Sequence, residues 1–433
     1  TTSDNTLAGR QSIALANDDG TNVVAIYTGT GLGSVSLSPD QTTIAFTEGG
    51  LFQPRNLHLI GTMPGSKKRQ ISSFDRGWIY QQQWLPDGKH LLAARSYEAF
   101  LTAPVSDLAV VSAESGVSRR VTMNLNMRFN HPTVSADGKR VVATAETYER
   151  EIWRVPITGT PEQNGAGAQL LVKEGNPMWI HAPAGSRDLL FNSTAHGGSN
   201  LFVMPMDGGA LPRQLTFNDS RDITHCALSP DGTRIAYALF GKGSSQIYVA
   251  NLDGSSARRL TSGPGIRYWP IWSPDSRFIA YTCFVPAGGP PAAHRVLRVP
   301  VAGGREESIT TNSGFFRGDW SPDGRTIVGY RDPGELQLLD VATGSYKVLA
   351  GGRWSWSLPV WNRAGTKVAA ARAETALSDA IWIIDARTGA AKKAAVFRGL
   401  FHIRFRTPFT PDEHAVIVNR EETVSNIVLL ENL

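Results

Sequence analysis

The stretch WSPDGRTIVGY, from Trp320 to Tyr330, decides the fold of this chain. It begins with an aromatic residue, passes through a Pro-Asp-Gly turn and ends in an alternation of apolar with small or polar residues. This order predicts two short antiparallel strands joined by a tight turn. Because similar stretches recur along the chain, the architecture follows from the repeat rather than from any single copy.

The copies are regularly spaced. Their motif positions are 40, 87, 137, 184, 231, 275, 323, 364 and 412, so successive copies lie 41 to 50 residues apart, and seven of the nine carry an aspartate there. A second pair of alternating strands follows each motif, which gives four strands per repeat. The fixed period overrides the expectation of two or three domains from chain length. We therefore expect one domain over residues 1–433.

Helical periodicity is nearly absent, so the sequence predicts an all-β fold, a single β-propeller of four-stranded blades. The position three residues before the motif aspartate is apolar in every copy except the one with His181, which predicts packing between blades. The N- and C-terminal strands are expected to share one blade and so close the ring, which removes exposed sheet edges. Nine motifs predict nine blades, and eight is the alternative if one terminal hairpin packs outside the ring.

Composition excludes several classes of protein. Lys and Arg total 43 against 38 for Asp and Glu, with no basic run, so a nucleic-acid groove is not expected. No apolar run reaches the roughly 18 residues of a membrane span. The first residues, TTSDNTLAGR, lack signal-peptide features, so we expect a mature or trimmed form. Cys226 and Cys283 are expected as free buried thiols, with a disulfide as the alternative, and no metal or other cofactor is expected.

The segments Leu228 to Thr261 and Trp272 to Tyr281 carry the most complete repeat: a Ser-Pro-Asp turn, then, in the first segment, the strand IYVANLDG and the strand RRLT. This pattern resembles the TolB-type, WD40-like propeller repeat, and the resemblance covers nearly the whole chain. It implies a propeller in an extracellular or periplasmic setting. The family's repeat also occurs in the propellers of prolyl oligopeptidases and in some polysaccharide lyases. We expect no counterpart here of the N-terminal α/β domain of TolB, and no G-x-S-x-G nucleophile is found.

In such a propeller the loops that enter each innermost strand meet the loops that leave the next strand around the mouth of the central channel. Guanidinium groups match carboxylates and aromatic faces stack on sugar rings, so Arg and aromatic residues there predict an anion-binding funnel. The candidate ligand-binding residues are Arg76, Trp78, Arg128, Arg221, Arg267, Trp269, Arg317, Arg353 and Trp356. The alternative is that these side chains pair with acidic neighbours and cover apolar edges.

His131 and His225 both lie six residues before a motif aspartate, and with Tyr148 and Tyr330 they are the candidate catalytic residues. Three functions follow from these sets. The favoured one is a secreted or periplasmic monomer that binds an anionic ligand, either an acidic glycan or a protein partner. The first alternative is a polysaccharide lyase that cleaves uronate-containing glycans by β-elimination, with His or Tyr moving the protons. The second is a purely structural or protein-interaction propeller. Whether the chain is an enzyme is left open by the sequence.

Overall fold

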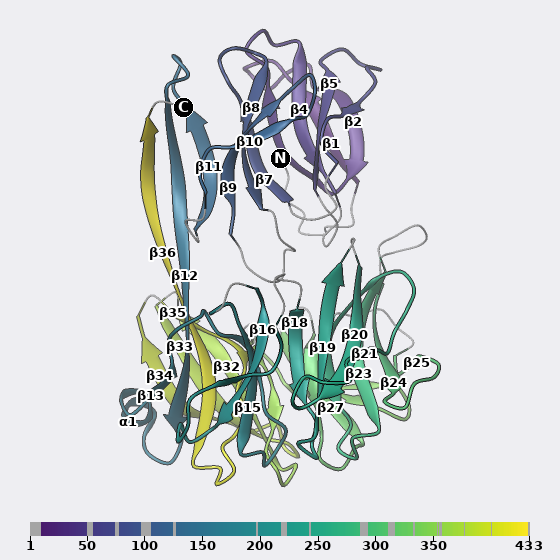
Figure 1. Ribbon diagram of the computed structural model, residues 1–433, viewed down its shortest axis with the longest axis vertical. Coiled ribbons are helices and arrows are strands. Elements are labelled where there is room, and N and C mark those ends of the chain that lie inside the picture. The colour runs from purple at the N-terminus through teal and green to yellow at the C-terminus, as the bar shows by residue number, and fades with distance from the viewer. Residues whose placement is uncertain are drawn as a thin grey trace. The chain divides into compact units, whose positions relative to one another are not determined.

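The computed structural model describes residues 10–49, 55–73, 78–96, 105–123, 127–195, 198–217, 223–241, 244–285, 293–310, 317–331, 334–352, 354, 357–375, 377–399 and 401–431. Contacts divide the chain into two compact units, each described here by itself. Unit 1 comprises Thr1–Thr147, Gly241–Gly243 and Val424–Leu433, and unit 2 comprises Tyr148–Phe240 and Ser244–Thr423. In both units nearly all regular structure is β-strand (Figure 1).

Unit 1 is built from consecutive antiparallel sheets. The first holds β1 (Arg10–Leu15) and β2 (Val24–Thr30); the second holds β3 (Leu32–Leu37), β4 (Thr43–Glu48), β5 (Asn56–Gly61) and β6 (Arg69–Gln70). The third holds β7 (Trp78–Trp84), β8 (His90–Ser96), β9 (Asp107–Ser112) and β10 (Ser118–Arg120), and β11 (Arg128–Val134) then pairs with β12 (Arg140–Pro156). Apolar residues of neighbouring sheets share cores, as Leu57 and Ile71 do with Trp84 and Leu91.

Unit 2 contains five four-stranded antiparallel groups in chain order. They are β14 (Met178–His181), β15 (Asp188–Ser193), β16 (Asn200–Pro205) and β17 (Arg213–Gln214); β18 (Ile223–Leu228), β19 (Arg234–Gly241), β20 (Ser244–Asn251) and β21 (Arg258–Arg259); β22 (Ile266–Trp272), β23 (Phe278–Val285), β24 (Ala293–Pro300) and β25 (Glu307–Ser308); β26 (Arg317–Trp320), β27 (Thr326–Arg331), β28 (Glu335–Asp340) and β29 (Tyr346–Ala350); and β31 (Val360–Trp361), β32 (Lys367–Thr375), β33 (Ser378–Asp385) and β34 (Ala391–Arg398).

The sixth group of unit 2 combines distant parts of the chain. Its order is β35 (Phe401–Arg406), β36 (Ala415–Glu431), β12 and β13 (Gln169–Val172), and the short β30 (Ser357–Leu358) runs parallel to β35. The 17-residue strands β12 and β36 have residues in both units. The one helix in the described residues, α1 (Pro161–Ala166), starts at Thr160, whose side chain and that of Gln163 form a capping box.

Apolar cores fill the junctions between successive sheets of unit 2 and return to the first. Innermost strands contact one another in the order β14, β18, β22, β26 and β31, then β35 contacts β32 and β14. The closing junction packs Ile152 of β12 and Ile417 of β36 against Ile180 and Phe191 of the first sheet. Six sheets therefore form a closed cycle, which is the arrangement of propeller blades.

The all-β propeller architecture predicted from the sequence is confirmed, but the predicted ring of nine blades, or eight, is not, because six sheets of unit 2 close on themselves. The N- and C-terminal strands do not share a blade among the described residues: β1 pairs with β2, and β36 pairs with β35 and β12. The ring closes through the middle of the chain because β12 carries buried Ile152 and Val155 beyond its first hairpin. That residues 1–433 form one domain stays a prediction.

The repeated turn has the hydrogen bonds that its sequence predicts. In the founding motif, Asp323 Oδ1 accepts hydrogen bonds from Ser321 Oγ at 2.6 Å and from the backbone N–H of Arg325 at 3.0 Å, while Ser321 Oγ accepts one from the N–H of Thr326. Gly324 has a φ of +76°, which suits glycine. The same bonds recur around the aspartates at 40, 137, 231 and 275. These aspartates stabilise turns.

The predicted packing position is buried throughout unit 2. Its residues there are His181, Leu228, Trp272, Trp320, Trp361 and Phe409. Leu37 of unit 1 departs from this pattern and is 41% exposed. The sheet that precedes it has only two strands, β1 and β2. No helix of the described chain has the length and apolar character needed to cross a membrane.

Candidate functional site

Three successive innermost strands of unit 2 are interrupted at the same place by a β-bulge. The pairing register breaks after Met178 in β14, after Thr224 in β18 and after Tyr268 in β22. The residues at these breaks have positive φ angles: 49° at Trp179, 44° at His225 and 54° at Trp269. Positive φ is rare for bulky residues, and bulges re-aim side chains beside functional sites.

The bulges bring the three aromatic side chains together. The ring centroids of Trp179 and His225 are 3.9 Å apart, and those of His225 and Trp269 are 5.2 Å apart in an edge-to-face arrangement. Tyr268 meets Trp269 edge-on at 4.4 Å. His225 is only 2% exposed and Trp269 6%, so the cluster is largely removed from water. Such stacking holds each ring in one orientation.

A small cavity lies beside this cluster. It is lined by Trp179 and Ile180 of β14, His225 and Cys226 of β18, Trp269 and Pro270 of β22, Leu358 of β30 and Arg406 of β35. Because these strands are the innermost ones of the cycle, the cavity lies on its axis. Its volume is only about 10 Å³, roughly the room of one water molecule, so with the side chains placed as they are it admits no more than the tip of a ligand.

The charged group in the lining is Arg406, which forms a buried ion pair with Asp319 of β26. Arg406 Nη1 is 3.1 Å from Asp319 Oδ1, and Nη2 donates to the carbonyl oxygen of Gly318 at 3.0 Å. Asp319 Oδ2 also accepts the backbone N–H of Trp361 at 3.2 Å. Burial raises the pKa of Asp319 and lowers the pKa of Arg406, while the opposite charges counteract both shifts.

Two further titratable groups near the cavity are held neutral. His181 Nδ1 accepts the backbone N–H of Leu228 at 3.1 Å, and burial, with the charge of Arg406, holds the pKa of His181 well below its usual value. Cys226 Sγ donates to the carbonyl oxygen of Trp179, and burial raises the pKa of this thiol to about 12. At neutral pH His181 is therefore an uncharged imidazole and Cys226 an uncharged thiol. Cys226 and Cys283 are both free and buried, as predicted.

The cavity contains two of the residues predicted for the site, His225 and Trp269. Arg267 instead lies 4% exposed inside the fold. Its Nε and Nη2 donate to Glu306, and its remaining N–H groups donate to the carbonyl oxygens of Ser262, Gly263 and Pro264. All five donors are therefore used within the fold, which matches the alternative of acidic pairing considered for these arginines.

The other predicted residues are placed elsewhere or lie outside the described part of the chain. Three of them, Trp78, Arg128 and His131, belong to unit 1. There the guanidinium of Arg55 lies 5.0 Å from the Trp78 ring, and that of Arg128 lies 4.6 Å from the Tyr80 ring. His131 is exposed and has a φ of 50°. Arg76, Arg221, Arg353 and Trp356 lie outside the described residues, as does the side chain of Arg317.

The four candidate catalytic residues are not brought together in one described site. His225 lines the axial cavity, and His131 belongs to unit 1. Tyr330 packs beside the core between the sheets of β26 and β31, and Tyr148 lies 5.5 Å from the guanidinium of Arg150. Neither tyrosine lines the cavity.

Arg406, Asp319 and Trp179 were absent from the predicted set, and a signal for Arg406 was available. Arg406 lies six residues before Asp412, the same offset that singled out His131 and His225. Leu358 has this offset from position 364, and Trp269 from Asp275. In four sheets of unit 2 the residue at this offset therefore lines the cavity, whereas the lining residue of β14 is Trp179, five residues before position 184.

The closed cycle of sheets with a cavity on its axis defines this chain as a β-propeller protein. Residues 223–353 match the family model described as the TolB beta propeller domain. A solved structure described as a putative TolB from Agrobacterium tumefaciens shares the fold, with a TM-score of 0.50 and 18% identity over 64% of this chain and 99% of that chain. Residues 223–353 thus carry repeats of the TolB type, as the resemblance implied.

Curated relatives agree with this assignment. An uncharacterized protein of Agrobacterium fabrum is 27% identical over 271 residues, which cover 58% of this chain and 87% of that protein. The Tol-Pal system protein TolB of Anaeromyxobacter dehalogenans is 32% identical over 120 residues. This match covers 26% of each protein, so the chain spans about a quarter of the length of that TolB.

Proposed function

We propose that this protein is a binding module that receives the acidic end of a ligand in the axial cavity of unit 2. The observation that carries the proposal is the convergence of Trp179, His225 and Trp269, each at a strained positive φ, beside Arg406. Strained backbone at bulky residues persists only where the surrounding fold imposes it, and such residues cluster at ligand sites.

The lining suits a ring that bears a carboxylate. The hydrogen bonds of Arg406 to Asp319 and Gly318 use two of the five N–H groups of its guanidinium, so further donors remain for a ligand carboxylate. Asp319 holds the guanidinium in place, and Trp179 and Trp269, which line the cavity, can contact a sugar ring at its mouth. We therefore propose an acidic carbohydrate as the ligand class, with the ring of a terminal uronate at the mouth of the cavity and its carboxylate directed toward Arg406.

The proposal includes an extracellular or periplasmic location and a monomeric protein, as expected from the sequence. Similarity to a protein named for the Tol-Pal system supports the location. A protein partner with a free carboxyl terminus offers the same chemical group, so it is the natural competitor for the cavity.

Calorimetric titration with short oligosaccharides that end in a uronate, and with their neutral counterparts, tests the proposal. We expect saturable binding of the acidic series alone. Trp179→Ala should weaken it by about tenfold or more, the loss expected when a stacking ring is removed. Trp382→Ala is the matched control, because the Trp382 ring is likewise stacked against a neighbouring side chain, that of Arg372, but does not line the cavity.

The same mixtures distinguish the alternatives. A rise in ultraviolet absorbance from an unsaturated uronate product would show that the protein is a lyase rather than a binding module. Binding of peptides through a free carboxyl terminus, without any affinity for uronates, would show that the ligand is a protein rather than a carbohydrate. If no acidic ligand binds, or if Trp179→Ala binds as well as the wild type, the cavity is not the site.

A further inference from the structure

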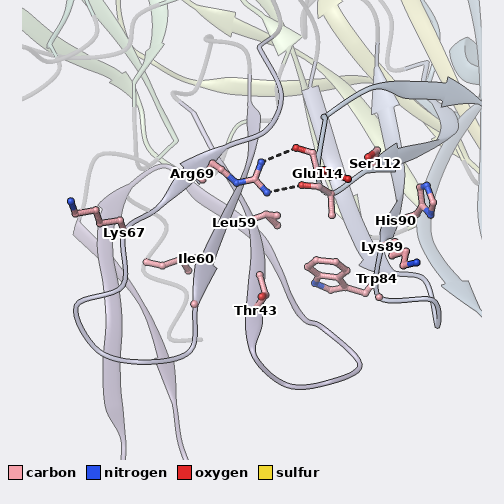
Figure 2. Close-up of a pocket in the computed structure, with 13 residues that line it drawn as sticks. Thr43, Leu59, Ile60, Lys67, Arg69, Trp84, Lys89, His90, Ser112 and Glu114 are labelled. Atoms are coloured by element: carbon pink, nitrogen blue, oxygen red, sulfur yellow. Dashed lines mark hydrogen bonds between the residues drawn. The ribbon is translucent and has the colours of Figure 1, made fainter.

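A second site is indicated in unit 1, in a groove between the sheets β3–β6 and β7–β10. The groove opens where β4 and β8 begin and where β5 and β9 end. Its lining includes Lys67 and Arg69 from one sheet and Trp84, Lys89 and His90 from the other (Figure 2). None of these residues belongs to the axial cavity of unit 2.

Arg69 fixes the two sheets at this groove. Its Nη1 donates to the carbonyl oxygen of Glu114 at 2.9 Å and its Nη2 to that of Ala113 at 2.8 Å, the two bonds drawn in Figure 2. In unit 2, Arg258 donates in the same way to the carbonyl oxygen of Val301. Neutral carbonyl groups orient the guanidinium but leave its positive charge in the groove.

The groove is positively charged overall. Lys67 and Lys89 are exposed and form no ion pair with any residue that the structure describes. Glu114 is the one acidic residue among the described lining residues. The His90 ring lies 2.6 Å from Oδ2 of Asp87, which does not line the groove. Three permanent cations therefore face one carboxylate, which favours an anionic ligand.

Trp84 adds a directed donor. Of its counterparts at the same motif position, Trp272 and Trp361 each donate the indole N–H at 3.1 Å to a carbonyl oxygen of the preceding sheet. Trp320 donates to the carbonyl oxygen of Gly324 in its own turn. Trp84 is only 6% exposed, and its indole N–H is buried without an acceptor in the described chain. The same side chain lines the groove. Buried N–H groups are nearly always paired, so an orphan beside a cationic groove calls for an acceptor from outside.

We propose that this groove binds an oxyanion, a carboxylate, sulfate or phosphate group, which accepts the Trp84 indole N–H and is attracted by Lys67 and Lys89. The site is independent of the axial cavity. Its affinity should fall with rising salt, because both lysines are exposed. Since the proposal concerns the shared oxygen chemistry, the three anions are separate arms of the test.

The test follows the tryptophan indole N–H resonances by NMR of the whole chain during titration with sodium acetate, sulfate or phosphate at fixed ionic strength. Trp84→Phe assigns the Trp84 signal and removes its indole N–H donor while keeping an aromatic ring at that position. We expect this signal to move saturably with at least one anion while that of Trp361, already bonded, stays in place. The double variant Lys67→Ala/Lys89→Ala should weaken binding by about three- to tenfold, as expected for two exposed charges.

Lys139→Ala is the matched control, because Lys139 follows Gly138 as Lys89 follows Gly88, yet it does not line the groove. We expect it to bind as the wild type does. The proposal is overturned if the Trp84 signal does not saturate with any of the three anions, or if the double lysine variant binds as tightly as Lys139→Ala. Trp179→Ala should keep this response, which separates the groove from the axial cavity.

Discussion

Arg406 and Asp319 form an ion pair inside unit 2, with 3.1 Å between Nη1 and Oδ1 and with exposed fractions of 5% and 13% for the two side chains. The pair joins β35 to β26 across the axis of the cycle. A buried pair of this kind is expensive to break, because the partner left behind is a charge without compensation. It therefore fixes both the strands and the cavity lining.

Removing one partner should destabilise the fold strongly. We expect Arg406→Leu to lower the free energy of unfolding by about 3–5 kcal/mol, because the Asp319 carboxylate is then buried without its cationic partner. Urea unfolding measures the change. The double variant Arg406→Leu/Asp319→Leu should be clearly less destabilised than the sum of the two single variants, and strict additivity would show that the two groups are not coupled.

The turn aspartates should make stability depend on acid. The pKa of Asp323 is lowered from its ordinary 3.8, chiefly by the hydrogen bond from the Ser321 hydroxyl. Burial opposes this shift, and the backbone N–H of Arg325 adds a smaller lowering effect. A lowered carboxyl pKa in the folded state contributes stability that is present above the unfolded pKa and is lost as pH falls through the folded value. The unfolding free energy should therefore fall on acidification below about pH 4.

Asp323→Asn tests this at one turn. It keeps an acceptor but removes the charge, so we expect lower stability than wild type at neutral pH, measured by urea unfolding across a pH series. The difference between the two proteins should shrink as the wild-type aspartate is protonated. A difference that stays constant down to the lowest pH would mean that the charge does not contribute.

The structure within each repeat could be predicted from the sequence, but the contacts between distant repeats could not. The hairpin from Trp320 to Tyr330 depends on neighbours within one turn, so its strands, its Asx bonds and its buried tryptophan were predictable. Ring closure depends instead on which sheets meet. The copy beginning at Val134 continues into a 17-residue strand, and its pattern does not reveal that Ile152 packs against Ile180.

The same division holds for the site. The offset of six residues drew attention to His225, and in four sheets of unit 2 the residue at this offset lines the axial cavity. Arg267 was misleading, since its partner Glu306 lies 39 residues further along and no local pattern joins them. Arg406 shared the offset of His225, but its pairing with Asp319, 87 residues away, becomes visible only in three dimensions.

The two cysteines should resist modification in the folded protein. Burial raises the thiol pKa of both Cys226 and Cys283, so little thiolate forms at neutral pH and reagent cannot reach it. We expect a chromogenic thiol reagent to detect no free thiol in the native protein and two after denaturation. Rapid labelling of either cysteine in the native state would contradict the burial seen here.

A pair of glycines in unit 1 separates backbone strain from steric overlap. Gly88 and Gly116 have φ angles of +64° and +72°, yet a Cβ atom at Gly88 would meet nothing within 4 Å, whereas one at Gly116 would lie 1.7 Å from the carbonyl oxygen of Ile71. We expect Gly88→Ala to lower the free energy of unfolding by about 1 kcal/mol through its positive φ alone. Gly116→Ala should lower it by about 3 kcal/mol or more, because the turn must move away from the preceding sheet. Urea unfolding of both variants measures the difference, and equal losses would show that the contact between Gly116 and Ile71 does not hold these sheets together.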